Sequence, residues 1–124
     1  MPNVTWPVSA SNLLETCTMQ ILPVDLARML AETDPPRLLD VREPEEHAFA
    51  SLPGALHIPL GQLESRIDEL ASWQAEDFVV YCHHGMRSAR AVGFLRSIGF
   101  TGAANLAGGI DRWSLEVDPT LPRY

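Results

Sequence analysis

Long hydrophobic runs are missing from this sequence, and none approaches the roughly 20 residues that a helix needs to cross a bilayer. The first seven residues also lack the basic segment and the apolar segment of a secretory signal peptide. Basic residues are also few: the chain has nine basic and 16 acidic side chains, which give a formal net charge of −7. An acidic surface repels phosphate backbones and anionic lipid, so we expect a cytoplasmic protein without nucleic-acid or membrane partners.

Cysteine is also scarce, with only Cys17 and Cys82 among 124 residues. Two cysteines do not form a disulfide framework, and a chain of this length that is 46% hydrophobic can bury a core without disulfides or metals. Cys17 has no glycine, basic residue or helix start beside it, so we interpret it as an incidental thiol, while a role as a second, resolving cysteine stays open. Residues 1–17 read as an N-terminal extension, and residues 18–124 as one domain with an extended C-terminal tail.

Short apolar strands alternate with amphipathic helices along the rest of the chain. The predicted strands cover residues 19–22, 37–41, 55–58, 78–81 and 103–106. The predicted helices cover residues 23–32, 44–50, 61–72 and 87–98, with a last short helix around Trp113. This alternation predicts an α/β fold with a parallel sheet covered on both faces. In such sheets ligands bind beyond the carboxyl ends of the strands, where the segments 40–42, 82–87 and 107–109 fall.

The segment after the fourth predicted strand carries the strongest chemical signal. The strand leads into Cys82-His83-His84-Gly85-Met86-Arg87-Ser88, and a helix is predicted from about Arg87. Such a loop directs backbone N–H groups and the positive end of a helix dipole at the cysteine sulfur. Because the thiolate is the reactive form of cysteine, this placement predicts that Cys82 is a nucleophile. A core cysteine at a strand end is the alternative, and Gly85, Arg87 and the two histidines argue against it.

The loop also suits a cysteine persulfide, which carries its negative charge on a sulfur beyond the cysteine sulfur. We expect five or six successive N–H groups of the loop to converge on that point, as they do in an oxyanion hole. Gly85 supplies the positive φ that lets the loop close. Arg87 adds a cation suited to an anionic donor such as a thiosulfonate, and His83 and His84 can do the same or donate hydrogen bonds.

Two other segments lie at the same predicted edge of the sheet. Arg42 is expected to help attract an anion, and Asp40 to give structural support, chiefly by pairing with an arginine. The pair Gly108-Gly109 is interpreted as serving turn geometry alone, and Trp113 as core packing.

A metal site and a catalytic triad are weaker interpretations of the same region. The adjacent His83 and His84 cannot easily both reach one ion, and no fourth ligand follows with a zinc spacing, so we expect no metal and no cofactor. His57 and His47 are further imidazoles, but nothing in the sequence connects either of them to Cys82. His47 is predicted to be an exposed surface side chain.

Four motifs in this order resemble the single-domain rhodaneses, which are thiosulfate sulfurtransferases, over about residues 19–118. The motifs are Leu39-Asp40-Val41-Arg42 with Pro44-Glu45-Glu46, then Leu52-Pro53-Gly54-Ala55-Leu56-His57-Ile58-Pro59, then Cys82 to Ser88, and last Asn105-Leu106-Ala107-Gly108-Gly109-Ile110 with Trp113. The resemblance implies a sheet of about five mostly parallel strands with helices on both faces. It also implies that Cys82 takes the outer sulfur of thiosulfate as a persulfide, which a thiol or cyanide then removes.

The resemblance further implies that His83, His84, Gly85, Met86, Arg87 and Ser88 form the loop that binds the transferred sulfur, with Arg87 at its lip. A protein as sulfur donor or acceptor stays open beside small molecules. The related phosphatases and arsenate reductases have a loop longer by one residue, whereas Cys82 and Arg87 enclose four residues here, which suits a single sulfur better than an oxyanion. Inactive binding modules of the family typically lack the cysteine that this chain retains.

Overall fold

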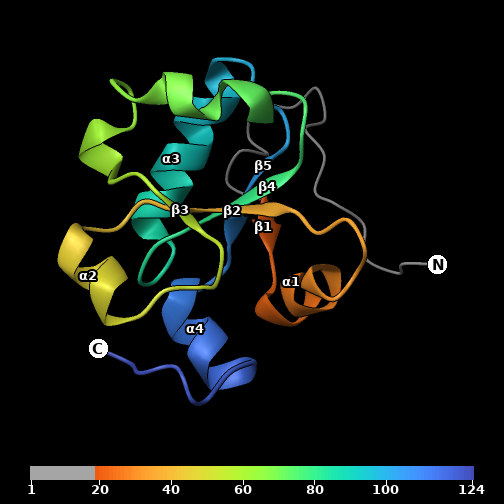
Figure 1. Cartoon of the computed structure of the whole chain (residues 1–124), viewed down its shortest axis with the longest axis vertical. Coiled ribbons are helices and arrows are strands. Elements are labelled where there is room, and N and C mark those ends of the chain that lie inside the picture. Colours follow the sequence, from red (N-terminus) through yellow and green to blue (C-terminus); the bar gives the residue numbers. More distant parts are fainter. Residues whose placement is uncertain (1–18) are drawn as a thin grey trace.

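The structure, a computed structural model, describes residues 19–124 (Figure 1). The predicted N-terminal extension and Cys17 lie outside the described residues. Within residues 19–124, the strands are β1 (Gln20–Ile21), β2 (Arg37–Asp40), β3 (Leu56–His57), β4 (Phe78–Tyr81) and β5 (Ala103–Leu106). The α-helices in the same range are α1 (Pro23–Leu30), α2 (Pro44–Phe49), α3 (Met86–Ser97) and α4 (Gly109–Glu116). None of the helices in this range has the length and apolarity that a membrane span requires.

The strands form one parallel sheet in the order β1-β5-β4-β2-β3. Side chains of the central strand β4 alternate between two apolar cores, with Phe78 and Val80 in one and Val79 and Tyr81 in the other. Figure 1 shows α3 over one face of the sheet and α1 and α4 over the opposite face. Because both faces are covered, β4 reads in the sequence as a continuous apolar run. The five-stranded parallel sheet with helices on both faces confirms the predicted fold class.

Local sequence signals set most helix boundaries. Pro23 and Pro44 open α1 and α2, because a first-turn residue needs no N–H partner inside the helix. α3 begins one residue earlier than predicted, and Gly99 follows its end with a φ of +104°. Ile98 lies at the C-cap of α3 and is 42% exposed. Trp113 is buried in the core on the α1 and α4 face, as predicted.

The helix predicted for residues 61–72 is wrong in type. The structure has two 3₁₀ segments there, η2 (Leu60–Gln62) and η3 (Ile67–Trp73). Their bonds span three residues, as in Leu63 N–H to the Leu60 carbonyl at 3.2 Å. Leu63 and Leu70 are still buried against the α3 face of the sheet. A 3₁₀ turn aligns side chains at i and i+3, so the apolar spacing alone does not separate it from an α-helix.

The parallel direction of the strands brings their carboxyl ends to one edge of the sheet. Cys82 follows β4 directly, Arg42 lies two residues beyond β2, and Gly108 lies two residues beyond β5. The three predicted segments therefore meet at this edge, with the Cys82 loop between the other two because β4 is the central strand.

Candidate active site

Cys82 lies at the base of a tight loop between β4 and α3. Its side chain is 1% exposed, and the loop closes through Gly85, the N-cap of α3, which has a φ of +101°. An added Cβ at Gly85 would lie 3.4 Å from the backbone nitrogen of Gly108. The site therefore requires glycine at this position for its backbone conformation, in agreement with the sequence interpretation.

The cysteine sulfur is surrounded by hydrogen-bond donors from the start of α3. Its Sγ accepts from the Gly85 N–H at 3.1 Å, from the Ser88 N–H at 3.4 Å and from the Ser88 hydroxyl at 3.3 Å. The first backbone bond of the helix runs from Ala89 N–H to the Gly85 carbonyl, so the preceding amides have no acceptor within the helix. These amides and the helix dipole favour negative charge on or next to the sulfur.

Two carbonyl groups at the start of the loop accept hydrogen bonds from α4. The Cys82 carbonyl accepts from Ile110 N–H at 2.9 Å, and the His83 carbonyl accepts from Asp111 N–H at 3.1 Å. An added Cβ at Gly109 would lie 2.3 Å from the His83 carbonyl oxygen and 2.5 Å from that of Cys82. The interpretation of Gly108-Gly109 as turn geometry alone is therefore wrong, because Gly109 also permits this close approach of α4 to the loop.

Asn105, within β5, forms hydrogen bonds with the Cys82 loop. It was not identified as a site residue from the sequence. Its Nδ2 donates to the Gly85 carbonyl at 3.1 Å and to the Gln20 Oε1 at 3.1 Å, and its Oδ1 accepts from the Ser88 hydroxyl. Asn105 is 3% exposed and Ser88 is fully buried. The sequence signal was a polar amide inside an apolar strand, since a buried polar side chain requires partners.

Arg42 and Asp40 form a buried pair beside the loop. The Asp40 Oδ1 accepts from the Arg42 N–H and Nε, both at 2.9 Å, and the Oδ2 accepts from the Arg42 Nη2 at 2.7 Å. Burial disfavours the Asp40 carboxylate, but the bonds from Arg42 and His47 outweigh it and lower the pKa of Asp40. Because Arg42 is fully buried and bound to protein groups, its expected role in attracting an anion does not fit, whereas the structural pairing of Asp40 is confirmed.

Two histidines lie on the outer side of this pair. His47 places its Nδ1 2.7 Å from the Asp40 Oδ2, and its side chain is 30% exposed, so the prediction of an exposed surface residue is wrong. Its ring stacks on that of His57, with centroids 4.4 Å apart, and the His57 Nε2 donates to the Arg42 carbonyl at 2.7 Å. These contacts give both histidines structural partners.

Arg87 reaches from the first turn of α3 to α2. Its Nη1 and Nη2 donate to the Glu46 Oε1 and Oε2 at 2.7 and 2.9 Å. These bonds lower the pKa of Glu46 to about 2, although partial burial opposes the shift. The same bonds raise the pKa of Arg87 above its already high ordinary value. Glu46 was part of a motif in the sequence, but its pairing with Arg87 was not predicted.

Tyr124 lies at the outer wall of the site. Its hydroxyl accepts from the Arg42 Nη1 at 2.8 Å and donates to the Glu46 Oε2 at 2.9 Å. Its ring stacks on His83, with centroids 3.9 Å apart, and His83 stacks on His84 at 3.8 Å. Burial, together with the neighbouring His84, lowers the pKa of His83.

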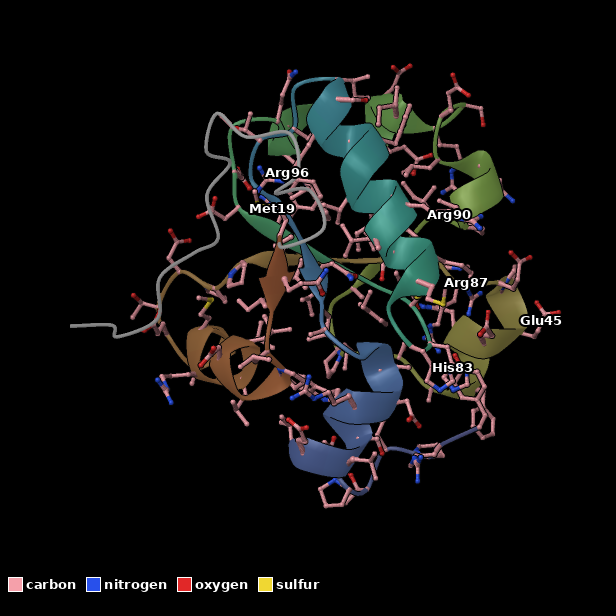
Figure 2. The ribbon with its side chains drawn as sticks, turned by 180° about the vertical axis from the view of Figure 1, so that it is seen from behind. Met19, Glu45, His83, Arg87, Arg90 and Arg96 are labelled. Atoms are coloured by element: carbon pink, nitrogen blue, oxygen red, sulfur yellow. The ribbon has the colours of Figure 1, made fainter. Side chains whose placement is uncertain are left out.

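The side chains of the loop differ in exposure and in their contacts. Met86 is 78% exposed and the His84 side chain 63% exposed, so both lie at the surface around the loop. Ser88 by contrast faces the sulfur, and His83 lies between Tyr124 and His84. Figure 2 shows His83 near the base of α3 and Arg87 beside α2.

His83, His84 and Asp111 form a group whose potential ligand atoms all lie within 4.8 Å of one another. The argument that adjacent histidines cannot approach one ion was therefore too strict. The two rings stack, however, and Arg123 donates to both Asp111 oxygens, at 2.8 and 3.3 Å. A bound cation would have to displace Arg123 and turn a ring, so this arrangement supports an ion pair better than a metal site.

The fold and the site define a parallel α/β protein with a buried cysteine at the amino end of a helix. Residues 22–116 match the family described as the rhodanese-like domain, and the chain belongs to this family. Human thiosulfate:glutathione sulfurtransferase is 40% identical over 98 residues, which cover 69% of this chain and 85% of that protein. A crystal structure of a rhodanese-like domain protein from Staphylococcus aureus has a TM-score of 0.72 at 30% identity, covering 85% of this chain and 97% of that one.

Some relatives are much longer than this chain. The adenylyltransferase and sulfurtransferase MOCS3 of Arabidopsis thaliana is 38% identical over 101 residues, which cover 70% of this chain. The chain spans only 22% of that protein.

Proposed function

We propose that this protein is a sulfurtransferase that carries a sulfane sulfur as a persulfide on Cys82. The observation that carries the proposal is the set of three hydrogen bonds from Gly85 and Ser88 to the Cys82 Sγ at the amino end of α3. Donors fixed in this way stabilise a thiolate before the reaction and a persulfide anion after it, without reorganisation of the loop. His84, Met86 and Arg87 complete the proposed substrate-binding loop.

The reaction consists of two displacements. The Cys82 thiolate attacks the outer sulfur of a donor such as thiosulfate; the donor S–S bond breaks, its electron pair leaves with sulfite, and Cys82 becomes a persulfide anion. A thiolate or cyanide then attacks the outer sulfur of the persulfide, and the electron pair of that S–S bond returns to Cys82 as thiolate. Charge and oxidation level balance in each step, so the reaction needs no cofactor or metal.

The relatives support sulfur transfer as the general chemistry, since two of them are named sulfurtransferases. One of these names specifies thiosulfate and glutathione, and we extend the proposal to a small-molecule donor and a thiol acceptor on that basis. The other relative is a longer protein in which the matched region is one part, so a protein donor or acceptor is also included in the proposal. A cytoplasmic location, where thiols stay reduced, fits this chemistry, and cell fractionation tests it.

The decisive experiment follows the sulfur on the protein by intact mass. Wild-type protein incubated with thiosulfate should gain the mass of one sulfur atom, and cyanide should remove it with release of thiocyanate. Cys82→Ser should show no gain, because serine forms no persulfide, whereas Cys17→Ser should behave as wild type. A gain on Cys17 in the Cys82→Ser protein would overturn the assignment.

The rival enzymatic interpretation is a phosphatase or arsenate reductase that uses the same cysteine. The Gly85 and Ser88 donors lie within hydrogen-bond distance of the sulfur itself, which favours a loop fitted to one added atom over one fitted to a tetrahedral oxyanion. Turnover of an aryl phosphate that disappears in Cys82→Ser would support the rival. A binding module without activity would show neither persulfide formation nor phosphate release.

A further inference from the structure

Three arginines around the Cys82 loop are paired with carboxylates. Every basic residue of this chain is an arginine, and three of them lie near the loop. Arg42 pairs with Asp40, Arg87 pairs with Glu46, and Arg123 pairs with Asp111. Each of these pairs is close to neutral, so these three arginines add little net positive charge at the site for a multiply charged anion.

The ion pair of Arg87 and Glu46 joins α2 to the first turn of α3, which also holds Ser88, a donor to the Cys82 Sγ. Both Glu46 oxygens are occupied, because Oε1 also accepts from the Glu43 N–H at 2.9 Å and Oε2 from the Tyr124 hydroxyl at 2.9 Å. The Glu46 side chain is 17% exposed and that of Arg87 34%, so solvent screens the pair only in part. With a pKa of about 2, Glu46 is a carboxylate throughout the physiological range.

The other polar groups at the site do not supply the missing charge. The amides and hydroxyl around the Cys82 Sγ are neutral dipoles, suited to one negative sulfur. The lowered pKa of His83 keeps its ring neutral near pH 7. His84 lies 3.8 Å from Asp111, which offsets its charge when it is protonated.

We propose that Glu46 is a specificity-determining residue that offsets the charge of Arg87 and directs the site toward sulfur donors with at most one negative charge. Donors of this class are alkyl persulfides and thiosulfonate monoanions, whereas the thiosulfate dianion still reacts but with a lower kcat/KM. The inference rests on the sulfurtransferase function proposed above and specifies the substrate class of the same site.

Two donors that differ by one charge test this assignment. Thiosulfate and methanethiosulfonate deliver the same sulfane sulfur, but a methyl group replaces one charged oxygen in the second. With cyanide as acceptor, kcat/KM is measured for both donors, and the ratio of thiosulfate to methanethiosulfonate is compared between variants. The ratio cancels changes that affect both donors equally, such as a partly disordered loop.

Glu46→Gln should raise this ratio about tenfold, because it leaves the charge of Arg87 without its carboxylate partner. An unpaired positive charge attracts the thiosulfate dianion more strongly than the methanethiosulfonate monoanion. Glu45→Gln is the matched control, since it removes the same charge from the same helix at an exposed position that points away from α3 (Figure 2). Its ratio should change by less than about twofold, because exposed charges at a distance are screened.

Arg87→Gln should lower the ratio about tenfold, because Glu46 then repels the dianion without an opposing cation. The double variant Glu46→Gln/Arg87→Gln has the same net charge as wild type, so its ratio should return to near the wild-type value. A merely structural role of the pair would not produce this return. If Glu46→Gln does not fold, the single variant Arg87→Gln still tests the proposal.

Unchanged ratios in Glu46→Gln or in Arg87→Gln would overturn the role of Glu46 while leaving sulfur transfer in place. Failure of the wild-type protein to form a persulfide with either donor would overturn the sulfurtransferase function itself. The two failures are therefore distinguishable in one set of measurements.

Discussion

The Ser88 hydroxyl has one proton and two acceptors, the Cys82 Sγ and the Asn105 Oδ1. The Asn105 amide has a fixed orientation, because its Nδ2 donates to the Gly85 carbonyl, which can only accept. Its Oδ1 must then face Ser88. We expect the hydroxyl to donate to Asn105 while Cys82 is a thiol and to rotate toward the sulfur when the sulfur becomes negative.

Ser88→Ala removes this donor and should slow persulfide formation about tenfold at pH 7, since a hydrogen bond to a charged group contributes about 1.5–3 kcal/mol. Alkylation of Cys82 by iodoacetamide should slow similarly, which separates an effect on the thiolate from an effect on donor binding. Ser97→Ala, which removes an exposed hydroxyl from the same helix, is the control and should leave both rates unchanged. Equal alkylation rates in Ser88→Ala and wild type would contradict the proposed contact.

Among the site residues, the sequence predicted contacts between residues that are close along the chain. It missed contacts between residues that are far apart in the sequence. Cys82, Gly85 and Ser88 stand within seven positions, so a loop with convergent donors could be inferred from their order. Glu46 is 41 positions from Arg87, and Asn105 is 17 positions from Ser88. Such pairings depend on how distant strands and helices pack, which local patterns do not contain.

At the scale of helices and strands, the contact between α4 and the Cys82 loop fixes the position of the loop. Gly109→Ala places a Cβ against the Cys82 and His83 carbonyl oxygens at a φ of +67°. We expect the free energy of unfolding to fall by about 2–4 kcal/mol and persulfide formation to be lost or much slower, because the loop must shift. Urea denaturation and intact mass after thiosulfate measure the two effects.

Gly93→Ala is the matched control within α3, where an added Cβ meets nothing within 4 Å. It should stabilise the protein by about 0.5–1 kcal/mol, as alanine does in helix interiors, with activity retained. Destabilisation by Gly93→Ala, or a normal stability of Gly109→Ala, would show that the contact between α4 and the loop is less tight than described.

Most elements could be predicted because prolines, glycines and apolar runs mark their ends directly. Pro23, Pro44 and Gly99 lie where helices begin or end. The segment around Leu63 and Leu70 was predicted as one helix, because burial of every third or fourth residue is common to α and 3₁₀ geometry. Only the hydrogen-bond pattern separates the two.

For the whole molecule, the ion pair between Arg87 and Glu46 joins α3 to α2 and makes stability depend on pH. The pKa of Glu46 is about 2 in the folded protein against 4.5 for an ordinary glutamate. A carboxylate with a lowered pKa stabilises the fold above its unfolded pKa, and this contribution is lost as pH falls from about 5 to about 2. The lowered pKa of Asp40 acts in the same direction.

Glu46→Gln should therefore lower the free energy of unfolding by about 1–2 kcal/mol at pH 7, after allowance for solvent screening of the partly exposed pair. The difference from wild type should begin to shrink near pH 5 and be much smaller at pH 3, where most of the contribution of wild-type Glu46 is lost. Urea denaturation at pH 7, 5 and 3 measures both values, with Glu45→Gln as the control. A difference that stays constant over this range would contradict the assignment of the pH dependence to Glu46.

The strand order has a consequence for where a reaction centre can arise. From β2 the chain continues outward to its neighbour β3, and from β4 it continues in the opposite direction to β5. The two connections thus diverge between adjacent strands, which is where parallel α/β sheets commonly bind their ligands. Cys82 leaves one of these strands and Asp40 ends the other, while Arg87 and Glu46 span the divergence from the two departing helices. The path of the backbone thus determines where Cys82 lies, independently of the side chains around it.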